Sequence, residues 1–193
     1  MGCGWFDVKL GIVSSSNTDP FNGSSAVEYE VTSTTGAAYF YPISPSISSG
    51  QVVTGSVYIK NVDQRYIQLL FGSTAFGNGH YQNFDLQTGT KGTSANIIDS
   101  SIESVGNGWY RLSITKQATA NGSSGLVCGF VPSSSATRLQ APSTLGLSLQ
   151  AFGFQTELGL VATDYIETGA STAQAGILED MPPLDRDWET KRL

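Results

Sequence analysis

Apolar and polar residues alternate with a period of two along most of this chain, and this alternation limits the folds open to it. In the segment 26–31, Val27, Tyr29 and Val31 point to one side and two glutamates point to the other. Such alternation is typical of a half-buried β-strand. Similar runs occupy residues 53–59, 65–71, 80–87, 109–116, 125–131, 145–154 and 164–167.

The segments between these runs are rich in glycine, serine and asparagine, which favour turns. A charged fraction of only 13%, together with 22 glycines, argues against a helical bundle. About ten or eleven short strands without a convincing helix predict an all-β fold, a two-sheet antiparallel β-sandwich of the jelly-roll type. One inward face per strand predicts a core that contains Val57, Ile59, Trp109, Leu112, Ile114, Leu147 and Leu149.

The composition changes near the C-terminus, where residues 173–193 are charged and interrupted by prolines. Proline excludes a regular central strand. We therefore expect one sandwich domain over residues 1–172, followed by a C-terminal linker or docking tail. A tail that folds back onto its own domain is the alternative to docking. The expected anchors on a neighbouring subunit are the large apolar residues Met181, Leu184 and Trp188.

The net charge of −6 comes with no basic stripe that could neutralise phosphates, so we expect no nucleic-acid partner. An anionic membrane surface is disfavoured for the same reason, and no run approaches the about 20 apolar residues of a membrane-spanning helix. The N-terminus lacks the basic and long apolar regions of a secretory signal. These features predict assembly in the cytoplasm, or a chain whose native N-terminus has been removed.

Few residues could support catalysis. His80 is the single histidine and no Gly-x-Ser-x-Gly elbow accompanies it, so we expect it at a strand edge, exposed or hydrogen-bonded. Glu28 and Glu30 share a strand face, and a solvated outer face explains them better than a glycosidase pair. Cys128 lies in an apolar run and should behave as a small buried residue. We predict that the chain is not an enzyme.

Four segments, taken in order, carry a family resemblance. They are residues 49–60 (SGQVVTGSVYIK), 106–114 (GNGWYRLSI), 153–159 (GFQTELG) and 162–168 (ATDYIET). With the turn Asp19-Pro20-Phe21-Asn22-Gly23, this set resembles the carbohydrate-binding-module-like, concanavalin-like jelly-roll modules of phage tail, fibre and other virion proteins. The resemblance covers residues 5–172. It departs at Phe152, where such modules often carry tryptophan.

The resemblance implies a non-enzymatic bacteriophage virion protein, either a structural or capsid-decoration protein or part of a tail fibre. Its expected partners are other virion proteins or further copies of the chain, within a virion assembled in the host cytoplasm. The resemblance also implies a structural calcium ion held by Asp19 and Asn22. The alternative there is an Asx turn, in which Asp19 bonds the backbone before Pro20.

A lectin-like adhesion module that recognises host-surface polysaccharide or mucin-like glycans is the alternative function. Sugar sites place exposed aromatic rings beside planar polar side chains. Alternation buries about half of the aromatic residues, and the sequence does not reveal which half. The candidate glycan-binding residues are Tyr39, Tyr41, Tyr58, Tyr66 and Tyr81, with Phe40 and Phe76 as further aromatic candidates.

Overall fold

The computed structural model describes residues 5–167. The strands within this range are β1 (Trp5–Val8), β2 (Leu10–Asn17), β3 (Ala26–Val31), β4 (Ala38–Pro42), β5 (Ser46–Ile47), β6 (Val52–Asn61), β7 (Tyr66–Phe71), β8 (Tyr81–Asp85), β9 (Thr90–Ala95), β10 (Asp99–Gly106), β11 (Trp109–Gln117), β12 (Gly122–Ser123), β13 (Leu126–Phe130) and β14 (Ser148–Leu158). A short helix, α1 (Ser73–Phe76), follows β7.

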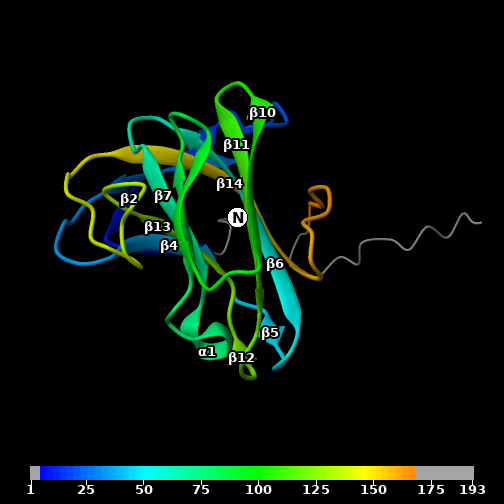
Figure 1. Ribbon diagram of the computed structural model, residues 1–193. Helices are drawn as coiled ribbons and strands as arrows, with labels where there is room; N and C mark the ends of the chain where they lie inside the picture. Colours follow the sequence, from blue (N-terminus) through cyan, green and yellow to red (C-terminus); the bar gives the residue numbers. More distant parts are fainter. Residues whose placement is uncertain (1–4, 168–193) are drawn as a thin grey trace, which may run out of the picture. The chain divides into compact units, whose positions relative to one another are not determined.

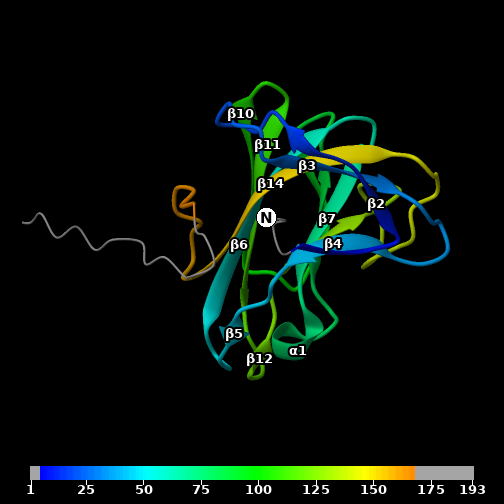
Figure 2. The same ribbon diagram turned by 180° about the vertical axis from the view of Figure 1, so that it is seen from behind.

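Two antiparallel six-stranded sheets pack face to face. Sheet A has the strand order β1-β4-β13-β7-β8-β9, and sheet B has the order β10-β11-β6-β14-β3-β2. The two layers are visible in Figures 1 and 2, with α1 beside the small β5–β12 ribbon at one end. The predicted all-β, two-sheet antiparallel sandwich is confirmed.

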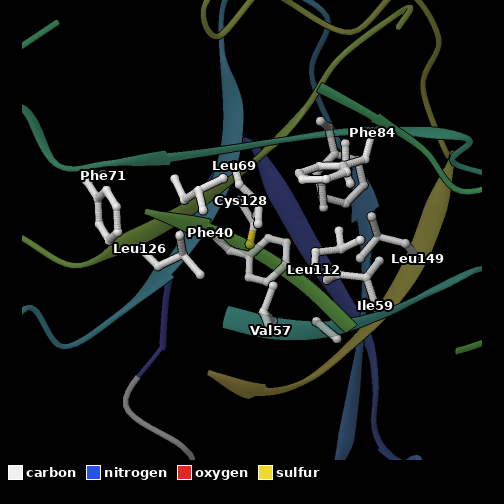
Figure 3. Packing of buried hydrophobic residues seen from close by; sticks show 14 of the residues in the cluster. Phe40, Val57, Ile59, Leu69, Phe71, Phe84, Leu112, Leu126, Cys128 and Leu149 are labelled. Atoms are coloured by element: carbon white, nitrogen blue, oxygen red, sulfur yellow. The ribbon is translucent and has the colours of Figure 1, made fainter. Parts of the chain in front are cut away.

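The core fills the space between the sheets (Figure 3). Sheet A contributes Phe40 and Leu69 among others, and sheet B contributes Val57 and Leu112. Cys128 lies in the same cluster with no exposed surface, and burial raises the pKa of its thiol. The prediction that Cys128 behaves as a small buried apolar residue is therefore confirmed.

The predicted core residues are buried with one exception. Leu147 is only partly buried, because it lies in the connection that precedes β14. Its carbonyl oxygen accepts the N–H of Val31. Trp109 is 1% exposed, as predicted, but it pairs with Lys60 on the face opposite Leu112. The Trp109 side chain is therefore buried on the outer side of sheet B, away from the central core.

Strand β6 departs from the expectation of one inward face per strand. Val57 and Ile59 face the core, yet Thr54, Ser56 and Tyr58, on the opposite side, are also buried. The pattern of buried residues therefore has no period of two here. The outer face of sheet B is partly covered, whereas a sheet with one solvated face would expose these residues.

The run at 164–167, predicted as a strand, forms none, since alternation makes a strand only where a partner strand is available. Conversely, no predicted run covers β1, β2, β4, β5, β9, β10 or β12. The compact sandwich unit extends to Ala162, and a second unit begins at Thr163. The predicted boundary at 172/173 and the tail residues Met181, Leu184 and Trp188 lie outside the described residues. Among residues 5–167, no helix is long and apolar enough to cross a membrane.

Candidate functional site

Sheet A presents most of the candidate tyrosines on its outer face. Tyr39 pairs with Gly129, Gly129 with Gln68, and Gln68 with Asn83, so these residues form one row across the sheet. Residues two positions apart on a strand share a face. The alternate residues on these strands lie in the core, so this row is on the outer face. The tyrosines on this outer face are Tyr39, Tyr41, Tyr66 and Tyr81.

The structure brings only part of this set together. The rings of Tyr39 and Tyr41 lie 6.0 Å apart, and Phe6 of β1 stacks on Tyr41 at 5.4 Å. We call these three residues the β1–β4 aromatic cluster. Phe6 is 52% exposed and was not predicted as a site residue. Tyr66 has a separate neighbour, the Arg65 guanidinium, whose Cζ lies 4.9 Å from the ring centre.

The connection between β13 and β14, residues 131–147, crosses the outer face of sheet A. Asn83 donates a hydrogen bond from its Nδ2 to the carbonyl of Ala136 at 2.7 Å. The Gln68 amide donates to the carbonyl of Thr137 and accepts the N–H of Leu139. Because Gln68 and Asn83 are fully buried, these bonds hold the connection firmly against the sheet.

A second aromatic group lies on the outer face of sheet B. Tyr58 pairs with Phe152 on one side and with Arg111 on the other. Phe21, from the loop between β2 and β3, lies 5.5 Å from the Tyr58 ring and 5.9 Å from the Phe152 ring. We call Phe21, Tyr58 and Phe152 the sheet B aromatic group. Tyr58 is only 5% exposed, whereas Phe21 is 57% exposed.

Arg111 joins this aromatic group to a polar pocket. Its Cζ lies 5.4 Å from the Tyr58 ring centre, and its Nη2 donates to the Ser56 hydroxyl at 3.2 Å. The pocket has a volume of about 190 Å³. Its lining residues are Thr54, Asp99, Ser101, Glu103, Arg111, Ser113, Thr115 and Leu160–Ala162. Hydroxyl groups, carboxylates and a guanidinium beside an exposed ring are suited to a polyhydroxylated ligand.

The segment after β14 forms one wall of this pocket. The Thr54 hydroxyl donates to the carbonyl of Gly159 at 2.9 Å, and Thr115 approaches the carbonyl of Leu160 at 3.3 Å. The two threonine hydroxyls also lie 2.8 Å apart. Two hydroxyl hydrogens cannot serve three contacts at once. The longer Thr115 contact is therefore the weakest, and the wall is held mainly through Gly159.

The loop that begins at Asp19 has the geometry of an Asx turn. Asp19 Oδ1 accepts the N–H groups of Phe21 and Gly23, both at 2.9 Å, and Oδ2 accepts that of Ser25 at 3.3 Å. Asn22 is exposed with a positive φ of 67°. Within residues 5–167, no group of three or more His, Cys, Asp or Glu side chains is arranged to hold a metal ion. The geometry favours the Asx turn, and calcium at Asp19 and Asn22 stays a prediction.

The residues weighed for catalysis have structural partners. Glu28 accepts hydrogen bonds from the Ser148 hydroxyl at 2.8 Å and from Gln150 at 3.2 Å. His80 is buried, and its Nε2 accepts the backbone N–H of Phe71 at 2.9 Å. Of the two expected alternatives, exposed or hydrogen-bonded, His80 is the hydrogen-bonded one, and it is buried just before β8. Phe71 and Phe76 pack against the His80 ring from the core side.

His80 should make the stability of the fold depend on pH. Burial, with the nearby charges of Lys116 and Arg138, lowers its pKa from 6.5 to about 4. Between these two values the unfolded chain binds a proton that the folded chain excludes, so stability falls as pH drops. We expect the free energy of unfolding at about pH 4 to be about 2–3 kcal/mol lower than its value above pH 6.5. Urea denaturation across this range measures the loss, and His80→Gln should remove most of it. An unchanged pH dependence in that variant would contradict the assignment.

Comparisons with known proteins do not place the chain in a family. A scan against protein-family models finds no match, and a search of curated proteins finds none either. No family is assigned by them.

Proposed function

We propose that the chain is a non-enzymatic structural module of a bacteriophage particle, a decoration or fibre component built on a carbohydrate-binding-module-like β-sandwich. The observation that carries this proposal is the arrangement of the resembling segments. Residues 49–60, 106–114 and 153–159 are far apart in sequence, yet they contribute most of β6, the start of β11 and the end of β14. These three strands are neighbours at the centre of sheet B. Their adjacency supports one inherited framework, because chance matches would not be expected to fall on paired strands.

The surroundings of the polar side chains support a non-catalytic role. His80 is buried and accepts a backbone hydrogen bond, while Glu28 is engaged by Ser148 and Gln150. General acid–base catalysis requires a titratable group within reach of a bound substrate. His80 has no solvent-exposed surface with which to meet one.

The virion role is tested on particles from the bacterium or phage that encodes the chain. Particles purified by density gradient should contain the chain in a fixed ratio to the major capsid protein, as measured by mass spectrometry. An antibody against the domain should also label the particle surface in electron micrographs. Particles that contain none of the chain would reject the proposal.

Glycan binding is the second candidate function, favoured by the exposed Phe21 ring and the polar pocket lined by Arg111, which are joined through the Tyr58 ring. Carboxylates of Asp99 and Glu103 line that pocket, so an uncharged sugar suits it better than a polyanion. The ring would stack on the sugar, and the pocket would pair with its hydroxyl groups.

Phe21→Ala should weaken this binding by about tenfold or more. The measurement is calorimetric titration with neutral oligosaccharides of glucose, galactose, mannose and N-acetylglucosamine. Phe6→Ala removes a comparably exposed ring from the opposite sheet and is the matched control. The candidate is rejected if no oligosaccharide binds or if the two variants bind alike.

A further inference from the structure

Arg138 occupies a fixed position over the outer face of sheet A. It lies between Thr137, whose carbonyl accepts the Gln68 amide, and Leu139, whose N–H donates to Gln68 Oε1 at 2.7 Å. Both neighbours of Arg138 are thus tied to the same buried side chain. The backbone at Arg138 is therefore anchored, although the connection from β13 to β14 is long.

The Nε of Arg138 lacks the hydrogen-bond partner that a buried donor normally has. Its Nε is buried and makes no hydrogen bond within the described part of the chain. The one ion pair found among residues 5–167 joins Arg65 and Asp85 elsewhere on the sheet. A buried donor without an acceptor destabilises the folded state, and more so when it is charged. Such a group is expected to have an acceptor that the folded chain alone does not supply.

The backbone beside Arg138 is strained. Leu139 has a φ of 49°, a left-handed conformation that bulky residues rarely adopt. Its side chain fills the space over Gly129, where an added Cβ would lie 2.8 Å from Leu139 Cδ2. Strain of this kind persists where surrounding contacts enforce it, and it is concentrated at ligand sites. Here the enforcing contacts are the Gln68 bonds.

One aromatic side chain, that of Tyr39, lies near this cation. Tyr39 pairs with Gly129, and the side chain of Leu139 lies over Gly129, so Arg138 is close to the Tyr39 side chain and interacts with it electrostatically. Tyr39 continues into the β1–β4 aromatic cluster through Tyr41 and Phe6. A guanidinium whose Nε makes no hydrogen bond is therefore close to Tyr39 and, through it, to the β1–β4 aromatic cluster.

We propose that Arg138, Tyr39 and Tyr41 form a binding site for a carboxylated sugar, distinct from the neutral-sugar site on sheet B. The guanidinium fork matches a carboxylate in two parallel hydrogen bonds. The rings of the β1–β4 aromatic cluster contact the apolar face of the sugar. The site does not depend on the function proposed above.

The chemistry of this face disfavours other anionic ligands. Binding of a peptide by strand addition needs a free sheet edge; Phe6 lies on the edge strand β1, but Tyr39 and Tyr41 lie on β4, which has a partner strand on each side. Nucleic acid needs several cations along its phosphates, and the chain carries a net charge of −6. A single carboxylate beside aromatic rings fits one guanidinium.

The test uses the full chain with three acidic sugars: glucuronate, galacturonate and N-acetylneuraminate. Glucose, galactose and N-acetylmannosamine are the uncharged probes. Binding is followed by calorimetry and by the Nε–Hε resonance of Arg138. At least one acidic sugar should bind about tenfold more tightly than its uncharged counterpart and shift that resonance. Arg138→Gln should reduce its affinity about tenfold or more. Arg65→Gln, which changes the arginine directly before β7, should leave the affinity unchanged.

A stability measurement separates a ligand site from a structural role. Removing a donor that has no partner should leave the melting temperature of Arg138→Gln unchanged or raised. The proposal is overturned if this variant melts markedly lower, if it retains full affinity, or if no acidic sugar binds better than its uncharged counterpart. Tighter binding of N-acetyl-Glu-Glu-amide than of every acidic sugar would assign the face to an acidic peptide instead.

Discussion

Phe40→Ala should lower the free energy of unfolding by about 3–5 kcal/mol. The Phe40 ring is fully buried and stacks on Tyr29 at 4.5 Å. It also meets Phe130 at 6.2 Å and Phe154 at 5.6 Å, edge to face. These neighbours come from both sheets, so the cavity left by the ring cannot close without moving one sheet against the other.

Urea denaturation at pH 7.5 measures the effect of Phe40→Ala. Phe6→Ala is the control, because the Phe6 ring is 52% exposed on edge strand β1. Its loss should cost less than about 1 kcal/mol. Equal losses in the two variants would show that the aromatic contacts around Phe40 do not hold the sheets together.

Trp109→Ala should also cost about 3–5 kcal/mol, although Trp109 points away from the central core. It is the largest of the fully buried side chains, at 1% exposure, and it lies on the outer side of β11. Val105→Ala on the neighbouring strand β10 changes a residue that is 43% exposed and is the control. Thermal unfolding compares the two. A Trp109→Ala variant that melts like the wild-type protein would show that this side of sheet B contributes no packing energy.

Alternation predicted the strands whose faces differ most in polarity. β3 is clear in the sequence because Val27 and Tyr29 alternate with glutamates. β10 was missed because its outward and inward residues are both mostly small and polar, with Ile102 as its partly buried contact with the core. In β6, the sequence placed Tyr58 on the face opposite Val57 but did not reveal whether it is buried, and its 5% exposure follows from neighbours on other elements that the β6 sequence does not encode.

In the candidate sites, too, the sequence predicted what depends on neighbouring residues and missed what depends on residues far away in the chain. Placing Tyr39 and Tyr41 on one strand face required only their spacing of two residues. The sequence did not indicate Arg138 as a site residue. Its backbone is held in place by Gln68, about 70 residues earlier in the chain. Phe21 could have been found, since a large aromatic residue within the polar turn Asp19-Pro20-Phe21-Asn22-Gly23 is unusual for a simple loop.

The last strand of the sandwich occupies a central place in sheet B. β14 lies between β6 and β3, and Gln150 pairs with Glu28 across more than half of the chain. A growing polypeptide therefore carries β3 and β6 with open edges until residue 158 has left the ribosome. Such edges template association with other chains, and pairing over this separation is slow, on the order of milliseconds to seconds. Synthesis thus includes an interval in which aggregation competes with folding, and a chaperone that shields β3 and β6 should raise the yield of soluble protein.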